Sequence, residues 1–324
     1  MQALDRSETD GELDVRVDWT PAYELYVSFI AFTLRDKHTL DELGPDWLPN
    51  VRRALPPDFA ASKLFRPKQD DALLMRLILG APPSARGSAD AWLDWYVGLS
   101  AGAAYEALAP VTPADEAPQL PRDFVAWRDR LASMLRTWST SIFAHVEPTL
   151  LEALRHEAAA LSKRLEACPP AQRRTLVADV TNGIWIEADS GVDRVVLVPQ
   201  FHQRPYNEDN SIAGGILLLY PADSAARPAD GPPLGLLRLT QGLADESRLK
   251  ILRFLATEGS KSLTDVAHFA GLSQPTVHHH LARLRVAGLV RVHVTGAHNR
   301  RYSLRPNAVS QLTSQLGQYL EVSA

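Results

Sequence analysis

The pattern of apolar and polar positions is most informative in the last quarter of the chain, where it predicts two short helices joined by a tight turn. The first helix is expected over residues 264–270, and Gly271 follows it where a helix end requires a positive φ. In the second helix, Val277, Leu281 and Leu284 recur at i, i+4 and i+7, which is the spacing of a buried stripe. The other side chains of this helix are mostly polar and are expected to face outward.

Alternating segments after the second helix predict a β-hairpin. Residues 289–294 and 300–304 have the alternation of strands, and residues 295–299 join them. A helix over 234–242 opens this part of the chain, and a last helix over 307–320 closes it. The order of these elements is that of a winged helix-turn-helix.

The first two-thirds of the chain predict a second, mostly helical domain. Three β-branched segments lie near its end, at 183–188, 194–200 and 214–220, with Gly, Asp and Asn between them. This arrangement is typical of a small antiparallel β-meander. The expected fold class is therefore α+β and mainly α, with an N-terminal helical domain that carries a small antiparallel β-meander, plus a C-terminal winged helix-turn-helix.

Composition places a boundary between these two domains. Residues 221–233 are rich in Ala, Pro and Gly and hold almost no bulky apolar residue, which is typical of a linker. We predict a disordered tail over 1–14, an N-terminal regulatory or oligomerisation domain over 15–221, a linker over 222–233 and a winged-helix domain over 234–324.

Charge is distributed unevenly between the two predicted domains. The chain of 324 residues carries a net charge of −4, but residues 1–234 carry −10, whereas residues 235–324 carry +6 and six of the ten histidines. A basic module on an acidic body indicates a polyanionic partner for the C-terminal part. Chance variation of the surface composition is the alternative reading.

The cysteine count and the hydropathy pattern restrict the cellular setting. Cys168 is the single cysteine, which excludes an intrachain disulfide and a multi-cysteine metal site and fits a reducing compartment. No window of about 18 apolar residues predicts a membrane span, and the acidic, polar start is unlike a signal peptide. We expect a cytoplasmic, nucleoid-associated protein.

A helix that presents hydrogen-bonding side chains near its N-terminus fits the major groove of double-stranded DNA. Gln274 can pair with adenine, and Thr276 can meet a thymine methyl group or a phosphate. Arginines on the hairpin can reach a phosphate or the minor groove. The predicted DNA-binding residues are Ser273, Gln274, Thr276, His278, His279, Arg283, Arg300 and Arg301.

Roles other than DNA contact are the alternative for several of these basic residues. The three histidines at 278–280 could form a metal site, but neighbouring helical positions point about 100° apart and cannot converge on one ion. His280 adjoins the apolar stripe and is expected to be partly buried and hydrogen-bonded. We predict no metal site and no cofactor. A solvated hairpin is the alternative for Arg300 and Arg301, and phosphate contact or simple solubility remain open for Lys250, Arg253 and Lys261.

The last 90 residues resemble the ArsR-type winged-helix transcriptional regulators. The matching pieces are LADESRLKIL at 243–252, GLSQPTVHHHLARLRVAGLV at 271–290 and the basic hairpin ending in RRYSL at 300–304. The resemblance implies a homodimer that binds a palindromic operator and pairs through its first and last helices. It places the dimer seam on Leu236, Leu239, Leu312, Leu316, Tyr319 and Leu320.

Metal sensing, as the best-known members of this family perform it, does not carry over. Their sensing cysteines lie on the helix that corresponds to 264–270, which contains none here. Their second metal site uses histidines and carboxylates of the last helix, and NAVSQLTSQLGQYL at 307–320 has neither.

The N-terminal part resembles the large, poorly described domain that precedes ArsR-type domains in some bacterial regulators. The matching pieces are TPAYELYVSF at 20–29, VVLVPQF at 195–201 and RPY at 204–206. This resemblance implies no known ligand.

One motif in the N-terminal part invites an enzymatic reading. GLSAG at 98–102 matches the nucleophile elbow G-x-S-x-G, which needs a strand before its serine and a helix after it. The preceding AWLDWYV predicts a helix, so close helix packing is favoured over a nucleophilic Ser100. No other catalytic motif is found, and we expect no enzymatic activity.

These patterns predict a sequence-specific DNA-binding transcription regulator, a homodimeric repressor whose N-terminal domain does not sense metal. About 200 acidic, aromatic-rich residues exceed what DNA binding requires, so an unknown effector or protein partner is expected at the N-terminal domain. The alternative is an enzyme or small-molecule receptor domain fused to a DNA-binding module.

Overall fold

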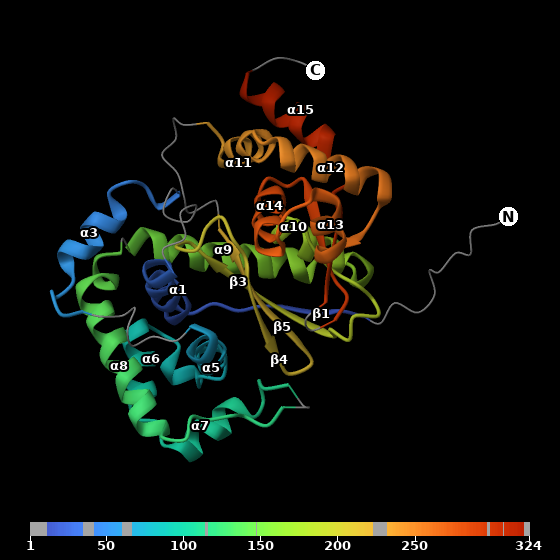
Figure 1. Cartoon of the computed structure of the whole chain (residues 1–324). Coiled ribbons are helices and arrows are strands. Elements are labelled where there is room, and N and C mark those ends of the chain that lie inside the picture. Colours follow the sequence, from blue (N-terminus) through green and yellow to red (C-terminus); the bar gives the residue numbers. More distant parts are fainter. Residues whose placement is uncertain are drawn as a thin grey trace. The chain divides into compact units, whose positions relative to one another are not determined.

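A computed structural model describes residues 12–34, 42–59, 67–113, 116–146, 148–222, 232–296, 299–306 and 308–320 (Figure 1). The chain forms two compact units, and each is assembled from separate stretches of sequence. The first, here called the helical unit, comprises residues 15–166 and 194–226. The second, here called the winged-helix unit, comprises the described residues up to 14, then 167–193 and 227–324.

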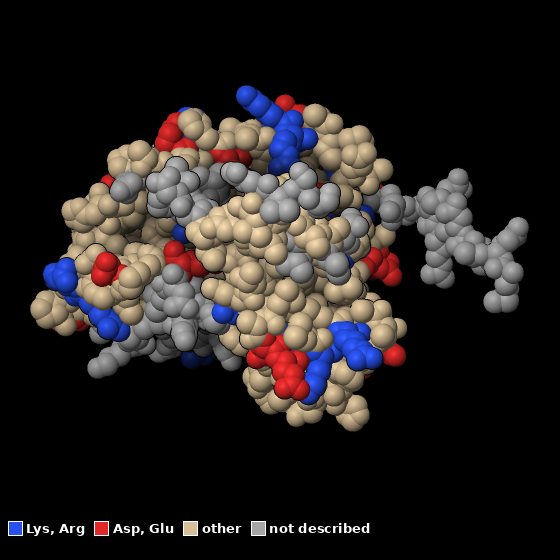
Figure 2. All heavy atoms as spheres, turned by 90° about the horizontal axis from the view of Figure 1, so that it is seen from above, with Lys and Arg blue, Asp and Glu red and all other residues tan. Residues whose placement is uncertain are grey.

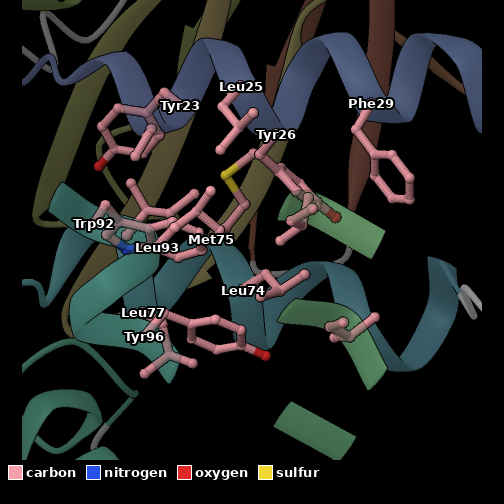
Figure 3. Packing of buried hydrophobic residues seen from close by; sticks show 14 of the residues in the cluster. Tyr23, Leu25, Tyr26, Phe29, Leu74, Met75, Leu77, Trp92, Leu93 and Tyr96 are labelled. Atoms are coloured by element: carbon pink, nitrogen blue, oxygen red, sulfur yellow. The ribbon is translucent and has the colours of Figure 1, made fainter. Parts of the chain in front are cut away.

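The helical unit is built around one buried helix. Every residue of α1 (Pro21–Leu34) from Ala22 to Phe32 is buried, as expected for a helix that is largely apolar on all sides. Side chains of α1, α5 and α6 meet in the core, as Figure 3 shows for Tyr26, Met75 and Trp92. The other α-helices among the described residues of this unit are α3 (Trp47–Ala54), α5 (Pro67–Leu79), α6 (Ala89–Val97), α7 (Ala101–Leu108), α8 (Phe124–Ser141) and α9 (Pro148–Glu166).

A four-stranded sheet in the order β1-β3-β5-β4 packs against these helices. Its strands are β1 (Asp14–Val17), β3 (Arg194–Gln200), β4 (Glu208–Ile212) and β5 (Gly215–Pro221). The predicted antiparallel meander is wrong, because β3 and β5 run parallel and β4 pairs with β5 as an antiparallel edge strand. Both parallel strands are buried along most of their length, which is typical of strands covered on two faces.

The winged-helix unit holds the predicted module and two elements that come from earlier in the chain. Its helices are α10 (Arg173–Val180), α11 (Leu234–Leu243), α12 (Glu246–Glu258), α13 (Leu263–Ala270), α14 (Gln274–Val286) and α15 (Ala308–Tyr319). Its sheet has the order β2-β7-β8-β6, with β2 (Ile184–Ile186), β6 (Lys261–Ser262), β7 (Val290–Val294) and β8 (Arg300–Leu304). The predicted fold class, α+β and mainly α with a winged helix-turn-helix, is confirmed.

Residues 167–193 lie in the winged-helix unit and not in the N-terminal domain to which their sequence pattern assigned them. Strand β2 pairs in parallel with β7, so that Ile184 lies opposite Val292. The amide of Asn182 donates to the carbonyl oxygen of Val286 at 2.8 Å and reinforces this pairing. The pattern of residues 183–188 identified a strand, but a strand pattern does not specify which edge the strand joins.

One of the points at which the chain passes from one unit to the other lies inside the predicted linker. Most of that linker, at 223–231, and most of the predicted tail, at 1–11, lie outside the described residues. Among the helices of the described part, none is long and apolar enough to cross a membrane.

Candidate nucleic-acid interface

Local contacts fix both ends of α13 and the start of α14. Ser262 and Asp265 form a reciprocal capping box at the start of α13, and Gly271 ends that helix with a left-handed φ of 64°. The hydroxyl of Ser273 then accepts the Thr276 amide and caps α14, while Pro275 occupies the first turn. The turn geometry therefore follows from residues within 14 positions of one another.

The buried and exposed faces of α14 are those that its periodicity predicts. Val277, Leu281 and Leu284 are almost completely buried and join the core formed with α12 and α13. Ser273, Gln274, Thr276, His278 and His279 are exposed, whereas Arg283, one turn later, is partly buried.

One exposed side chain of α14 is already held in place. The side-chain amide of Gln274 donates to the hydroxyl of Thr264 on α13 at 3.2 Å. This contact orients the amide and leaves its carbonyl oxygen and second N–H for another partner. The first two turns of α14 thus form a polar, outward surface.

The guanidinium groups of the two wing arginines both donate hydrogen bonds to backbone carbonyl oxygens. The Arg300 guanidinium donates to the carbonyl oxygen of Gly296 at 2.9 Å. Arg301 is exposed, and its guanidinium donates to the carbonyl oxygen of Ser260 at 2.5 Å. Arg301 uses Nε and one terminal nitrogen for Ser260, and a guanidinium has five N–H donors, so Arg301 keeps donors for a phosphate.

His280 is largely buried, whereas His278 and His279 are exposed. Its side chain is 13% exposed, and Nδ1 lies 4.0 Å from Asp245 Oδ1, too far for a hydrogen bond. Nδ1 has no hydrogen-bond partner among the described residues, so the expected burial is found but the expected hydrogen bond is not. Burial lowers the pKa of His280, against the opposing charge of Asp245. No group of three His, Cys, Asp or Glu in the described residues could hold a metal ion.

The residues of the predicted dimer seam divide into a buried group and an exposed group. Leu236 and Leu239 of α11 are buried within the unit, with 5% and 2% exposure. In contrast, Leu316, Tyr319 and Leu320 are 41%, 48% and 56% exposed, and Leu237 is 38% exposed. The side chain of Leu312 lies outside the described residues. Figure 2 shows a broad uncharged area on the face seen from above, with most Lys and Arg toward its edges.

The wing has contacts that the sequence did not predict. His293 of β7 lies between two partners, with Nδ1 2.5 Å from Glu187 Oε1 and Nε2 2.7 Å from the Ser303 hydroxyl. The Arg291 guanidinium lies 4.6 Å from the centre of the Trp185 ring. Glu187 and Trp185 belong to the β2 segment, about 100 positions earlier, and no local pattern links them to the wing.

Ser100 occupies a helix cap. Its hydroxyl accepts the Ala103 amide at 3.1 Å at the start of α7, and helix α6 ends at Val97, just before it. A nucleophile elbow requires a strand at that place. The geometry therefore explains the GLSAG motif as a cap between two helices.

Comparison with known proteins identifies the class of the C-terminal part. Residues 245–292 match the family model described as bacterial regulatory protein, arsR family. The match covers the helix-turn-helix described above and extends into the first strand of the wing. The C-terminal part is an ArsR-type winged helix-turn-helix, and the protein is a DNA-binding transcriptional regulator with an additional N-terminal region.

Two solved structures are similar to a quarter of the chain. One is a fragment, residues 1–100, of a possible transcriptional regulatory protein from Mycobacterium bovis, with 24% identity over 27% of this chain and 91% of that chain and a TM-score of 0.22. The other is NolR from Sinorhizobium fredii, with 25% identity over 28% of this chain and 87% of that chain and a TM-score of 0.22. No curated protein sequence matches the chain.

Proposed function

We propose that the protein is a homodimeric repressor whose α14 helices enter successive major grooves of a palindromic operator. The observation that carries this proposal is the exposed polar surface on the first two turns of α14, next to the tethered wing arginines. In such dimers the two half-sites lie about one helical turn, roughly 10 bp, apart. Arg300 and Arg301 would contact the backbone or the minor groove beside each half-site.

Replacing Gln274 and His279 together by alanine is expected to weaken operator binding by roughly 10- to 100-fold, because a good base contact is worth about 1–3 kcal/mol. Affinity is measured by fluorescence anisotropy on an operator recovered from genomic fragments that the purified protein retains. The matched control replaces Gln172 and His156, an exposed Gln and an exposed His outside α14, by alanine and should bind as wild type does. Equal affinity of the α14 variant and the control would disprove the helix assignment.

The proposed dimer uses the exposed apolar side chains of α15 together with Leu237 of α11. Replacing Leu316 and Leu320 by glutamate is expected to convert the dimer to a monomer, because the paired helices would bury four unpaired carboxylates. Light scattering on the eluting protein measures the mass. A Tyr105→Glu variant, which changes an equally exposed side chain of the helical unit, should leave the mass unchanged. A wild-type protein that elutes as a monomer would contradict the proposed dimer.

The helical unit is proposed to be the regulatory part. A ligand or protein bound there would shift operator affinity by about 1–3 kcal/mol, the usual range of coupling between two sites.

Operator affinity is also expected to fall steeply as salt rises, because each phosphate contact releases counterions.

A further inference from the structure

We propose that a cleft of the helical unit binds a small organic acid, with an aryl or alkyl body and one carboxylate. The cleft has a volume of about 960 Å³ and lies among α5, the end of α7, residues 116–121 and α8. This volume is in the upper range of small-molecule sites, which are roughly 300–1,000 Å³. Its lining residues include Leu73, Arg76, Leu108, Leu120, Trp127 and Arg130.

A fixed polar group forms one end of the cleft. Asp70 is 1% exposed and accepts the indole N–H of Trp127 at 2.8 Å. Arg130 reaches both oxygens of this carboxylate only at 3.3 and 3.4 Å, and its Nε has no hydrogen-bond partner among the described residues. Asp70 therefore holds the indole and the guanidinium in the wall, and Arg130 retains donors that the unit itself does not use.

A second guanidinium is paired with a carboxylate that a ligand can replace. Nε of Arg76 donates to the carbonyl oxygen of Ser211 at 3.0 Å and fixes the side chain. Its two terminal nitrogens both reach the same oxygen of Glu116, each at 3.2 Å. The Glu116 side chain is 49% exposed, whereas that of Arg76 is 14% exposed. A planar guanidinium binds most strongly when both oxygens of a carboxylate face its fork, an arrangement that Glu116 does not provide.

The remaining walls determine the class of acid. Leu73, Leu108, Leu120 and the Trp127 ring offer apolar surface for an aryl or alkyl body. Asp70, Glu116 and Asp123 also line the cleft and would repel a polyphosphate or a polycarboxylate. The occupant that fits both features is a monocarboxylate that displaces Glu116 from Arg76 and covers the apolar wall.

The test measures binding of phenylacetate and octanoate to the full-length protein by calorimetry, with phenylacetamide and octanamide as neutral analogues. We expect at least one acid to bind, and its amide to bind at least tenfold more weakly. Arg76→Gln should weaken acid binding at least tenfold, whereas Glu116→Gln should tighten it, because the competing internal carboxylate is removed. Arg155→Gln, which changes an exposed ion-paired arginine of α9, should have no effect.

Three results would overturn the proposal: no binding of either acid, equal binding of acid and amide, or weaker binding by Glu116→Gln. Because Arg76→Gln could also disturb folding, the opposite effect of Glu116→Gln provides the independent check. The role of this cleft as an effector site rests on the proposed function, but the binding measurement uses no DNA. A protein that binds the acid and no operator would therefore refute only the proposed function.

Discussion

Replacing Glu24 by alanine is expected to lower the free energy of unfolding of the helical unit by about 3–5 kcal/mol, the effect of leaving a buried charged network unpaired. The Glu24 carboxylate is fully buried in α1. It accepts the backbone N–H groups of Phe201 and His202 at 3.1 and 3.0 Å, and His202 Nδ1 lies 2.5 Å from it. Alanine would remove the partner of all three groups and leave a cavity.

This network holds the segment that follows β3 against the central helix. Arg204 is 2% exposed, donates to the carbonyl oxygen of Phe201 at 2.9 Å and stacks 3.8 Å from the centre of its ring. Gln200 accepts the Gln203 amide at 2.8 Å within the same turn. Because these contacts close the turn onto Glu24, its loss should loosen the end of β3 as well as α1.

Urea unfolding followed by tryptophan fluorescence measures this effect. Six of the seven tryptophans precede residue 167 and report on the helical unit, and Trp185 alone lies in the winged-helix unit. The control is Glu106→Ala, which removes an exposed helical glutamate and should change stability by less than about 0.5 kcal/mol. Equal urea midpoints for the two variants would show that the network does not stabilise the unit.

The winged helix could be predicted from the sequence because its signals are local. Gly271 and the stripe from Val277 to Leu284 lie where the sequence predicts them, and the Ser273 cap also acts within a few residues. The sequence did not predict which leucines of α11 pack inside the unit, since closely spaced leucines do not reveal which side of a helix is buried. The family resemblance placed Leu236 and Leu239 in the predicted seam, whereas both side chains are buried within the unit.

The helical unit could be predicted only in outline, because its decisive contacts join distant residues. Strand β4 was missed since EDNSI is polar and has no apolar alternation. In the winged-helix unit, the helix α10 was also missed, because its short, arginine-led segment begins only two residues after a pair of prolines. The Glu24 contacts join residues that are 177 or 178 positions apart, and the Arg76–Glu116 pair joins residues that are 40 positions apart. No rule of sequence spacing predicts contacts between such distant residues.

Replacing Gly183 by alanine is expected to separate β2 from the wing and to destabilise the winged-helix unit by at least about 2 kcal/mol, since backbone strain alone costs about 1–3 kcal/mol. Gly183 has a φ of +114°, which side-chain-bearing residues rarely adopt. A Cβ built there would lie 2.8 Å from the carbonyl oxygen of Val290, at the start of β7. The Gly183 carbonyl also accepts the Val292 amide at 2.8 Å, so the clash occurs where the two strands join.

Hydrogen exchange of the Val292 amide reports directly on this junction and should become faster in the Gly183→Ala variant. Gly191→Ala is the matched control, because Gly191 also has a positive φ of 72° but nothing within 4 Å of its Cβ position. It should show the cost of backbone strain without the clash, leaving Val292 protected. Protection of Val292 in both variants would mean that β2 can shift without leaving β7. If β2 separates, the contact of Glu187 with His293 is lost too, and the wing loses the support of an entire strand.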